Sequence, residues 1–218
     1  MATTADTKPA TTRKPAARRA PAAKRATPKP AAPTPASSGH GTAAMFGAAA
    51  AGLAAGLVAN LGRKVAVQAP TALQGDWLEG LKAEHKMTLA LFDLLQATTD
   101  KNKLKRSTLL TQIKHALAKH AMSEENAVYP ALREIGEVEK ADELNHEHGY
   151  VKDYLYQLDN LPKDSPVFLQ KVAEFRAALE EHIRDEEERV FPALHAKLSE
   201  AKNKALTHAA NKEGFKLA

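Results

Sequence analysis

The chain has 218 residues, with 31 lysines and arginines, 26 aspartates and glutamates, and no cysteine. This length suits one folded domain with additional segments, and the absence of cysteine excludes disulfides, thiolate zinc sites, iron–sulfur clusters and cysteine nucleophiles. The net charge of +5 is uneven: residues 1–45 hold eight basic residues and one acid, which leaves 23 basic and 25 acidic residues, a charge of −2, for the rest. Any metal site must use nitrogen and oxygen ligands.

Residues 1–42 consist mainly of Ala, Pro, Thr, Lys and Arg, with almost no large apolar side chain. Such a composition cannot bury enough surface to offset the entropy of ordering, so we predict a disordered basic tail. Two interpretations fit it equally well. The tail is either an arm that makes weak contacts with nucleic acid or an anionic membrane surface, or a solubilising segment, because charge alone attracts phosphates without specifying a sequence.

Residues 43–70 are predicted to form an Ala/Gly-rich apolar helix or linker. An uncharged run of 19 residues from Ala43 to Leu61 has the length of a membrane span, but Ala is only weakly apolar. Gly52 and Gly56 form a GxxxG pattern that favours close helix contact. We favour a helix that packs on the bundle or self-associates through these glycines over a membrane-associated helix, and both over a secretory signal. The expected location is cytoplasmic, with membrane association through residues 43–61 as the alternative.

Residues 71–196 show strong helical periodicity and no convincing alternating strand, so we predict an all-α, antiparallel up-down four-helix bundle. The expected helices cover residues 76–96, 103–128, 138–158 and 165 onward. Asp76 with Glu79 predicts a capping box at the first start, and Ser165 before Pro166 predicts the N-cap of the fourth helix. Residues 197–218 are expected to form a looser polar helical extension.

Each of the four predicted helices has a stripe of apolar residues along one face. Each stripe carries one histidine near its middle, and two of the stripes carry a glutamate one turn later. The six residues are His85, His120, Glu124, His148, His182 and Glu186. Helix positions i and i+4 differ by only ~40°, so each His-x-x-x-Glu pair can face the same inward point. A lone inward His is usually a hydrogen-bonded core residue, but unpaired charges buried in one layer cost several kcal/mol per ion. A bound cation pair would compensate them, and we predict a metal site.

The flanking candidates face elsewhere on a helical wheel. Glu125 and Glu187 are turned by ~140° from the histidines and are expected to lie behind the ligands or in solvent. Tyr150 and Tyr154 are expected in the core or at the rim, with an oxygen ligand from one of them as the alternative. The remaining histidines are expected to be bystanders: His40, His115, His146, His195 and His208.

The ligand pattern is repeated within the chain. Residues 116–132 and 178–194 share nine of seventeen letters at an offset of 62, and His85 and His148 differ by 63. The chain thus reads as two copies of a two-helix hairpin around a pseudo-twofold axis. The simplest arrangement for the cavity between the two hairpins is a pair of metal ions bridged by Glu124 and Glu186. Pro130 and Pro192 are expected to kink or end their helices just beyond the site.

These motifs, with EExxVYPAL and EExxVFPAL after the paired ligands, resemble the hemerythrin-like HHE cation-binding family. The resemblance covers roughly residues 76–195. It implies a left-handed four-helix bundle with a non-haem di-iron centre that can bind or react with O₂ or related small ligands. The oxygen carriers of this family have a His-x-x-x-His pair on the third helix, whereas Lys152 stands four residues after His148 here. The resemblance therefore implies an additional open coordination position.

Three functions remain open from the sequence. The first is a di-iron module that binds or senses O₂, redox state or iron. The second is a di-iron enzyme that acts on peroxide or nitric oxide at the open position. The third is an architectural protein whose basic tail contacts nucleic acid.

Overall fold

The structure is a computed structural model that describes residues 60–218. All regular elements in this range are helical, which confirms the predicted all-α class. After a helix over residues 60–72, the elements are α2 (Trp77–Gln96), α3 (Lys103–Ser123), η1 (Glu124–Val128), α4 (Tyr129–Glu134), α5 (Val138–Asn160), α6 (Phe168–Asp185), η2 (Glu186–Val190), α7 (Phe191–Lys197) and α8 (Glu200–Leu217). The predicted tail at residues 1–42, most of the Ala/Gly-rich segment with Gly52 and Gly56, and His40 lie outside the described residues.

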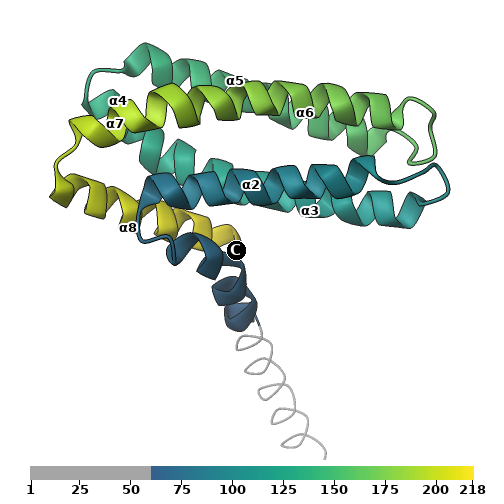
Figure 1. The fold of residues 1–218 in the computed structure, drawn as a ribbon, viewed down its shortest axis with the longest axis horizontal. Helices are drawn as coiled ribbons and strands as arrows, with labels where there is room; N and C mark the ends of the chain where they lie inside the picture. The colour runs from purple at the N-terminus through teal and green to yellow at the C-terminus, as the bar shows by residue number, and fades with distance from the viewer. Residues whose placement is uncertain (1–59) are drawn as a thin grey trace, which may run out of the picture. The chain divides into compact units, whose positions relative to one another are not determined.

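Two helical hairpins form the bundle (Figure 1). Helix α2 packs against α3 in the first hairpin, and α5 packs against α6 in the second. Contacts of α2 with α6 and of α3 with α5 join the hairpins, so each of these four helices lies against two of the other three. Short connections make successive helices antiparallel, as expected for an up-down bundle.

The helix starts agree only in part with the predicted caps. Asp76 is the N-cap of α2, and its Oδ1 accepts a hydrogen bond of 2.9 Å from the N–H of Leu78. Glu79 instead bonds Lys82, so the reciprocal half of the capping box is not formed. The predicted start of the fourth helix at Ser165 is wrong: Ser165 takes part in a turn that bonds the N–H of Phe168, and α6 begins there.

The prolines do not end the helices, which corrects one of the two effects expected of them, a kink or an end. A five-residue π-helical segment precedes each of them, in which the N–H of Tyr129 bonds the carbonyl of Glu124 and the N–H of Phe191 bonds that of Glu186. Proline lacks an N–H and clashes with the carbonyl four residues earlier in an α-helix. The wider π-turn relieves this conflict. The helices therefore continue through α4 and α7.

The core is divided into two apolar clusters. One contains Trp77 and Phe191, whose ring centroids are 5.5 Å apart, and the other contains Phe92 and Phe175, whose centroids are 5.2 Å apart. Along α2, His85 falls between Leu81 of the first cluster and Phe92 of the second. A polar layer thus lies between two apolar layers.

Helix α8 is well packed, whereas a looser extension was expected. It contacts α3, α2 and η1, and buries Leu206, Ala210 and Gly214. Its Asn203 accepts a hydrogen bond of 2.9 Å from the indole N–H of Trp77. The helix over residues 60–72 is joined to α8 by a 2.9 Å hydrogen bond from Gln68 to Asn211.

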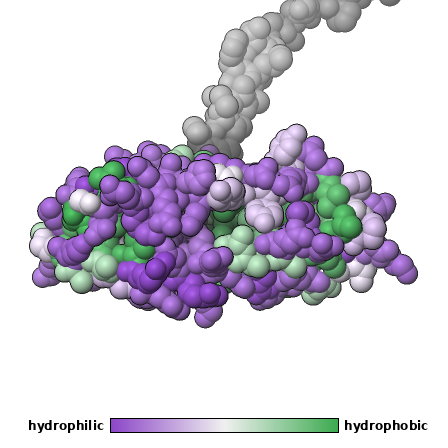
Figure 2. Space-filling model, turned by 90° about the horizontal axis from the view of Figure 1, so that it is seen from above, coloured by the Kyte–Doolittle hydropathy of each residue, from purple (hydrophilic) through white to green (hydrophobic). Residues whose placement is uncertain are grey.

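The surface is mostly hydrophilic on the face in Figure 2, with separate apolar patches. Exposed apolar side chains include Leu73 and Leu104. Among the helices of residues 60–218, none combines the length and apolar character required to cross a membrane.

Candidate metal centre

The six residues predicted from the sequence meet in the polar layer of the bundle. Each of the four long helices supplies one histidine, and each π-segment begins with one of the two glutamates. All six are buried. The structure thus brings every predicted ligand to one place, while their role as metal ligands remains a prediction.

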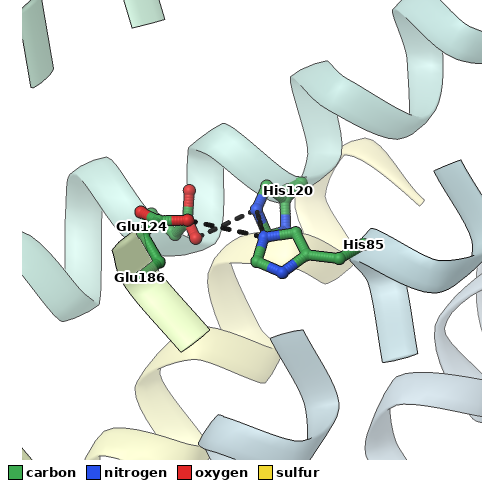
Figure 3. A group of neighbouring side chains, drawn as sticks. All are labelled: His85, His120, Glu124 and Glu186. Carbon is green, nitrogen blue, oxygen red and sulfur yellow. Dashed lines mark hydrogen bonds and ion pairs between the residues drawn. The ribbon is translucent and has the colours of Figure 1, made fainter. Parts of the chain in front are cut away.

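The ligand atoms form two overlapping groups. His85, His120, Glu124 and Glu186 make up one group, and Figure 3 shows all four side chains pointing toward one another. Glu124, His148 and His182 make up the other. Within each group the donor atoms lie within 4.8 Å of one another. Glu124 belongs to both groups, which is the arrangement of a carboxylate that bridges two cations.

The i, i+4 pairs point inward as expected. His120 Nε2 lies 2.9 Å from Glu124 Oε1, and His182 Nε2 lies 3.3 Å from Glu186 Oε2. The two hairpins approach each other across the centre, where His148 Nε2 lies 3.3 Å from Glu124 Oε2. His85 Nε2 lies 3.5 Å from Glu186 Oε2.

A glutamate carboxylate lies within hydrogen-bonding distance of the Nδ1 atom of each of the four histidines in the cluster. Glu187 lies 2.7 Å from His85 Nδ1, and Glu125 lies 2.9 Å from His148 Nδ1, so the two glutamates expected behind the ligands do lie there. Such contacts fix the ring orientation and leave Nε2 free for a metal.

Two further outer carboxylates were missed from the sequence. Glu84 lies 3.1 Å from His120 Nδ1, and Glu147 lies 2.6 Å from His182 Nδ1. Each comes directly before a histidine of the first helix in its hairpin, yet contacts the histidine of the second. The repeated Glu-His dipeptide at an offset of 63 was the available signal.

Tyr129 was also missed. Its hydroxyl donates to Glu186 Oε1 at 3.0 Å and lies 3.1 Å from His148 Nε2. The equivalent residue in the second hairpin is Phe191, so only one half carries this hydroxyl. Tyr150 is exposed and Tyr154 stacks on Phe175, so neither provides the oxygen considered from the sequence.

The charged groups of the layer shift one another's protonation. Burial disfavours the charged forms of His120 and Glu124, but their mutual attraction outweighs it, so the pKa of His120 is raised well above its ordinary value and that of Glu124 is well below. For His148, burial is likewise outweighed by hydrogen bonds to Glu124 and Glu125, which raise the pKa to about 9. In the metal-free centre, these raised pKa values favour the protonated forms of His120 and His148.

The inward atoms suit a cation. Within residues 60–218, three of them are buried and make no well-oriented hydrogen bond, although each lies 2.9–3.3 Å from another atom of the cluster: Glu124 Oε1, His182 Nε2 and Glu186 Oε2. Buried polar atoms are nearly always paired, and a bound ion is one of the explanations for an exception. Carboxylate oxygens and imidazole nitrogens are donors that iron, zinc and manganese accept.

His115, His146 and His195 lie away from the cluster, as expected. His146 bonds Tyr150 at the surface, and His195 contacts Asp76. His115 lines a separate cavity between α2, α3 and residues 60–72. Lys152 turns outward and bonds Glu125 at 3.2 Å.

A cavity of about 100 Å³ reaches the centre from the side, between α3, α5 and α6. His120, His148 and His182 line its inner end. Its walls are mostly apolar, from Leu117, Val151, Leu155 and Leu179, with Lys114 and Lys152 also lining it.

Comparison with known proteins agrees with this geometry. The model of the hemerythrin HHE cation binding domain matches residues 77–194, which is more than half of the chain. The chain belongs to this hemerythrin HHE family. The match ends close to the end of α7, so residues 60–72 and α8 lie outside it.

Three individual proteins resemble this hemerythrin HHE chain. An uncharacterized hemerythrin-like protein of Schizosaccharomyces pombe is 36% identical over 87 residues, 38% of this chain and 43% of that protein. A DNA nickase of Nostoc sp. is 29% identical over 119 residues, 55% of this chain and 33% of that protein. The chain thus spans less than half the length of these relatives. A crystal structure of a hemerythrin HHE cation binding domain-containing protein from Mycobacterium kansasii shares the fold, with a TM-score of 0.58, 24% identity and coverage of 65% of this chain and 86% of that one.

Proposed function

We propose that the chain holds a dinuclear non-haem iron centre that binds or senses O₂, redox state or iron. Membership of a cation-binding family and the donor set of four imidazoles and two carboxylates support this proposal. His85 and His120 would hold one metal and His148 and His182 the other. Glu124 would bridge them, and Glu186 lies within reach of both histidine pairs.

The lateral cavity is the observation that carries the small-ligand part of the proposal. Its volume of about 100 Å³ suits a diatomic or triatomic molecule, and its apolar walls favour an uncharged one such as O₂. Iron held at its inner end would supply open coordination positions and two accessible oxidation states. The apolar clusters on either side of the layer would exclude bulk water from the remaining faces.

A second candidate is an enzyme that acts on peroxide or nitric oxide at the same centre. The position of Lys152 favours it, because this side chain is 66% exposed and bonds Glu125, so it does not replace the missing histidine. A metal with fewer protein ligands leaves more room for a reacting molecule.

A third candidate, nucleic-acid contact, depends on the basic residues 1–42. The name of the Nostoc relative is compatible with it, but this chain matches only a third of that protein. We treat such contact, anionic membrane contact and self-association through Gly52 and Gly56 as additional proposals.

One experiment separates the first two candidates. Purified full-length protein is loaded with ferrous iron without O₂, iron per chain is measured, and the absorption spectrum is followed as O₂ is added. A new absorption band with about one ligand bound per centre supports binding or sensing. Many molecules of peroxide or nitric oxide consumed per centre support the enzyme, and absence of iron uptake contradicts both.

A further inference from the structure

Two outer carboxylates occupy equivalent places in the repeat but differ in their surroundings. Glu84 precedes His85 and holds His120, while Glu147 precedes His148 and holds His182. The side chain of Glu84 is 5% exposed, whereas that of Glu147 is 33% exposed. The two halves of the metal centre therefore differ in the carboxylates that contact the histidine ligands.

Glu84 is embedded in a buried cluster with Lys119 and Thr71. Its Oε1 accepts hydrogen bonds from Lys119 Nζ at 2.5 Å and from Thr71 Oγ1 at 2.7 Å, while its Oε2 faces His120 Nδ1. Lys119 Nζ also donates to Thr71 Oγ1 at 3.2 Å. Within residues 60–218, Glu147 makes a side-chain hydrogen bond to His182 alone.

The sequence explains this difference. The position equivalent to Lys119, at the repeat offset of 62, is Glu181, so the second hairpin has no lysine there. Thr71 comes from the helix over residues 60–72, outside the span matched by the family model. The cluster is thus an addition to the repeated hairpin and acts on one side of the centre.

The buried ammonium changes what Glu84 can do for His120. A carboxylate on the Nδ1 proton makes an imidazole a stronger electron donor to a metal on Nε2. Lys119 draws charge from that carboxylate and adds a positive charge that water screens poorly, because its side chain is only 5% exposed. Lys152 makes a similar contact with Glu125 behind His148, but solvent screens it.

We infer that Lys119 is a positioning residue of the metal centre: through Glu84 and His120 it favours the lower oxidation state of the metal beside it, and it makes the two metal positions unequal. This inference rests on the proposed iron centre. The hydrogen bonds around an iron site are a general means by which proteins set its potential.

The test compares K119M with K152M in the full-length, iron-loaded protein. Each substitution removes one ammonium from an outer glutamate and keeps a long side chain. In an optical redox titration, K119M should favour the oxidised state by about tenfold, which is a midpoint about 59 mV lower for a one-electron couple. K152M should change the ratio less than about twofold, and K119R should restore the wild-type midpoint.

The outcomes divide clearly. Equal midpoints for K119M and K152M, with iron bound in both, overturn the inference and leave the proposed function intact. If K119M loses iron, the midpoint of T71V is measured instead. This substitution removes one hydrogen-bond donor from Glu84 and should lower the midpoint by a smaller amount than K119M. An unchanged midpoint in T71V overturns the inference. A wild-type protein without bound iron, or without a redox couple, contradicts the proposed function together with the inference.

Discussion

Nε2 of His85 lies 2.8 Å from Nε2 of His120, although a carboxylate already holds Nδ1 of each ring. With the Nδ1 protons directed outward, the two inner nitrogens have room for at most one proton between them. A cation bound by both nitrogens would take the place of that proton. The pair therefore links metal uptake to proton release.

We expect about two iron atoms per chain after anaerobic loading, with protons released as they bind. The reason is that imidazoles whose pKa is raised in the metal-free protein must give up protons to coordinate. Elemental analysis measures the stoichiometry, and a pH indicator in weak buffer measures the protons. A single zinc per chain, or uptake without proton release, would contradict this expectation.

Substitution of the shared carboxylate should be more damaging than substitution of its neighbour. Glu124→Ala removes a donor common to both ligand groups, so at least one iron should be lost even at saturation. Glu125→Ala removes only the partner of His148 Nδ1 and should weaken binding by about tenfold to a hundredfold. Glu186→Ala and Glu187→Ala should repeat the contrast.

The control for these variants is Glu188→Ala, which removes an exposed charge beside the same cluster. Iron per chain is measured across a range of iron concentrations for all five proteins. Equal losses at Glu124 and Glu125 would show that the two residues do not have the different roles assigned here.

The metal-free protein should become less stable as the pH rises from 6.5 to 9.5. His148 has a folded pKa of about 9 against an ordinary value of 6.5, so its proton stabilises the fold fully below 6.5, and that stabilisation is lost as the pH rises through 9. The shift corresponds to about 3 kcal/mol. Urea unfolding at both pH values measures it.

Iron loading should remove most of this pH dependence, because the metal replaces the proton on His148. The variant His148→Gln should likewise show a flatter profile when metal-free. A metal-free wild-type protein as stable at pH 9.5 as at 6.5 would refute the assignment.

Deletion of residues 1–42 should leave iron content and helicity nearly unchanged. The described contacts of the centre come from residue 71 onward, and nucleic-acid affinity would come from scattered Lys and Arg in the tail. Any such affinity should disappear in the truncated protein and should fall steeply with salt in the full chain. Filter binding at two salt concentrations checks this, and loss of iron on truncation would disprove the domain boundary.

The helical class and the six inward residues followed from the sequence because i, i+4 spacing is a local property of one helix. Glu84 and Glu147 did not follow, because a helical wheel places each ~100° from the adjacent histidine and cannot show that it meets a histidine on the next helix. Tyr129 was missed for a different reason. Five residues after Glu124 it should face ~140° away in an α-helix, and only the π-turn brings its hydroxyl within 3.4 Å of that glutamate.

The start of α6 is a further feature that the local sequence did not predict correctly. Ser165 and Pro166 have the composition of a cap, but they form a turn, and the side chain that begins the helix is the buried Phe168. That ring packs in the second apolar cluster, and packing between distant segments is not visible in local composition.

Each π-turn works as a one-residue insertion that resets the register of its helix. Upstream of it the helix aims His120 and Glu124 at the centre, and downstream it aims Tyr129 and Leu132 into the core. Deleting one residue between Glu124 and Tyr129 would restore α-helical register, rotate everything beyond by ~100° and return Pro130 to conflict with the preceding turn. This stretch is therefore expected to tolerate changes of residue type at exposed Asn126 far better than any change of length.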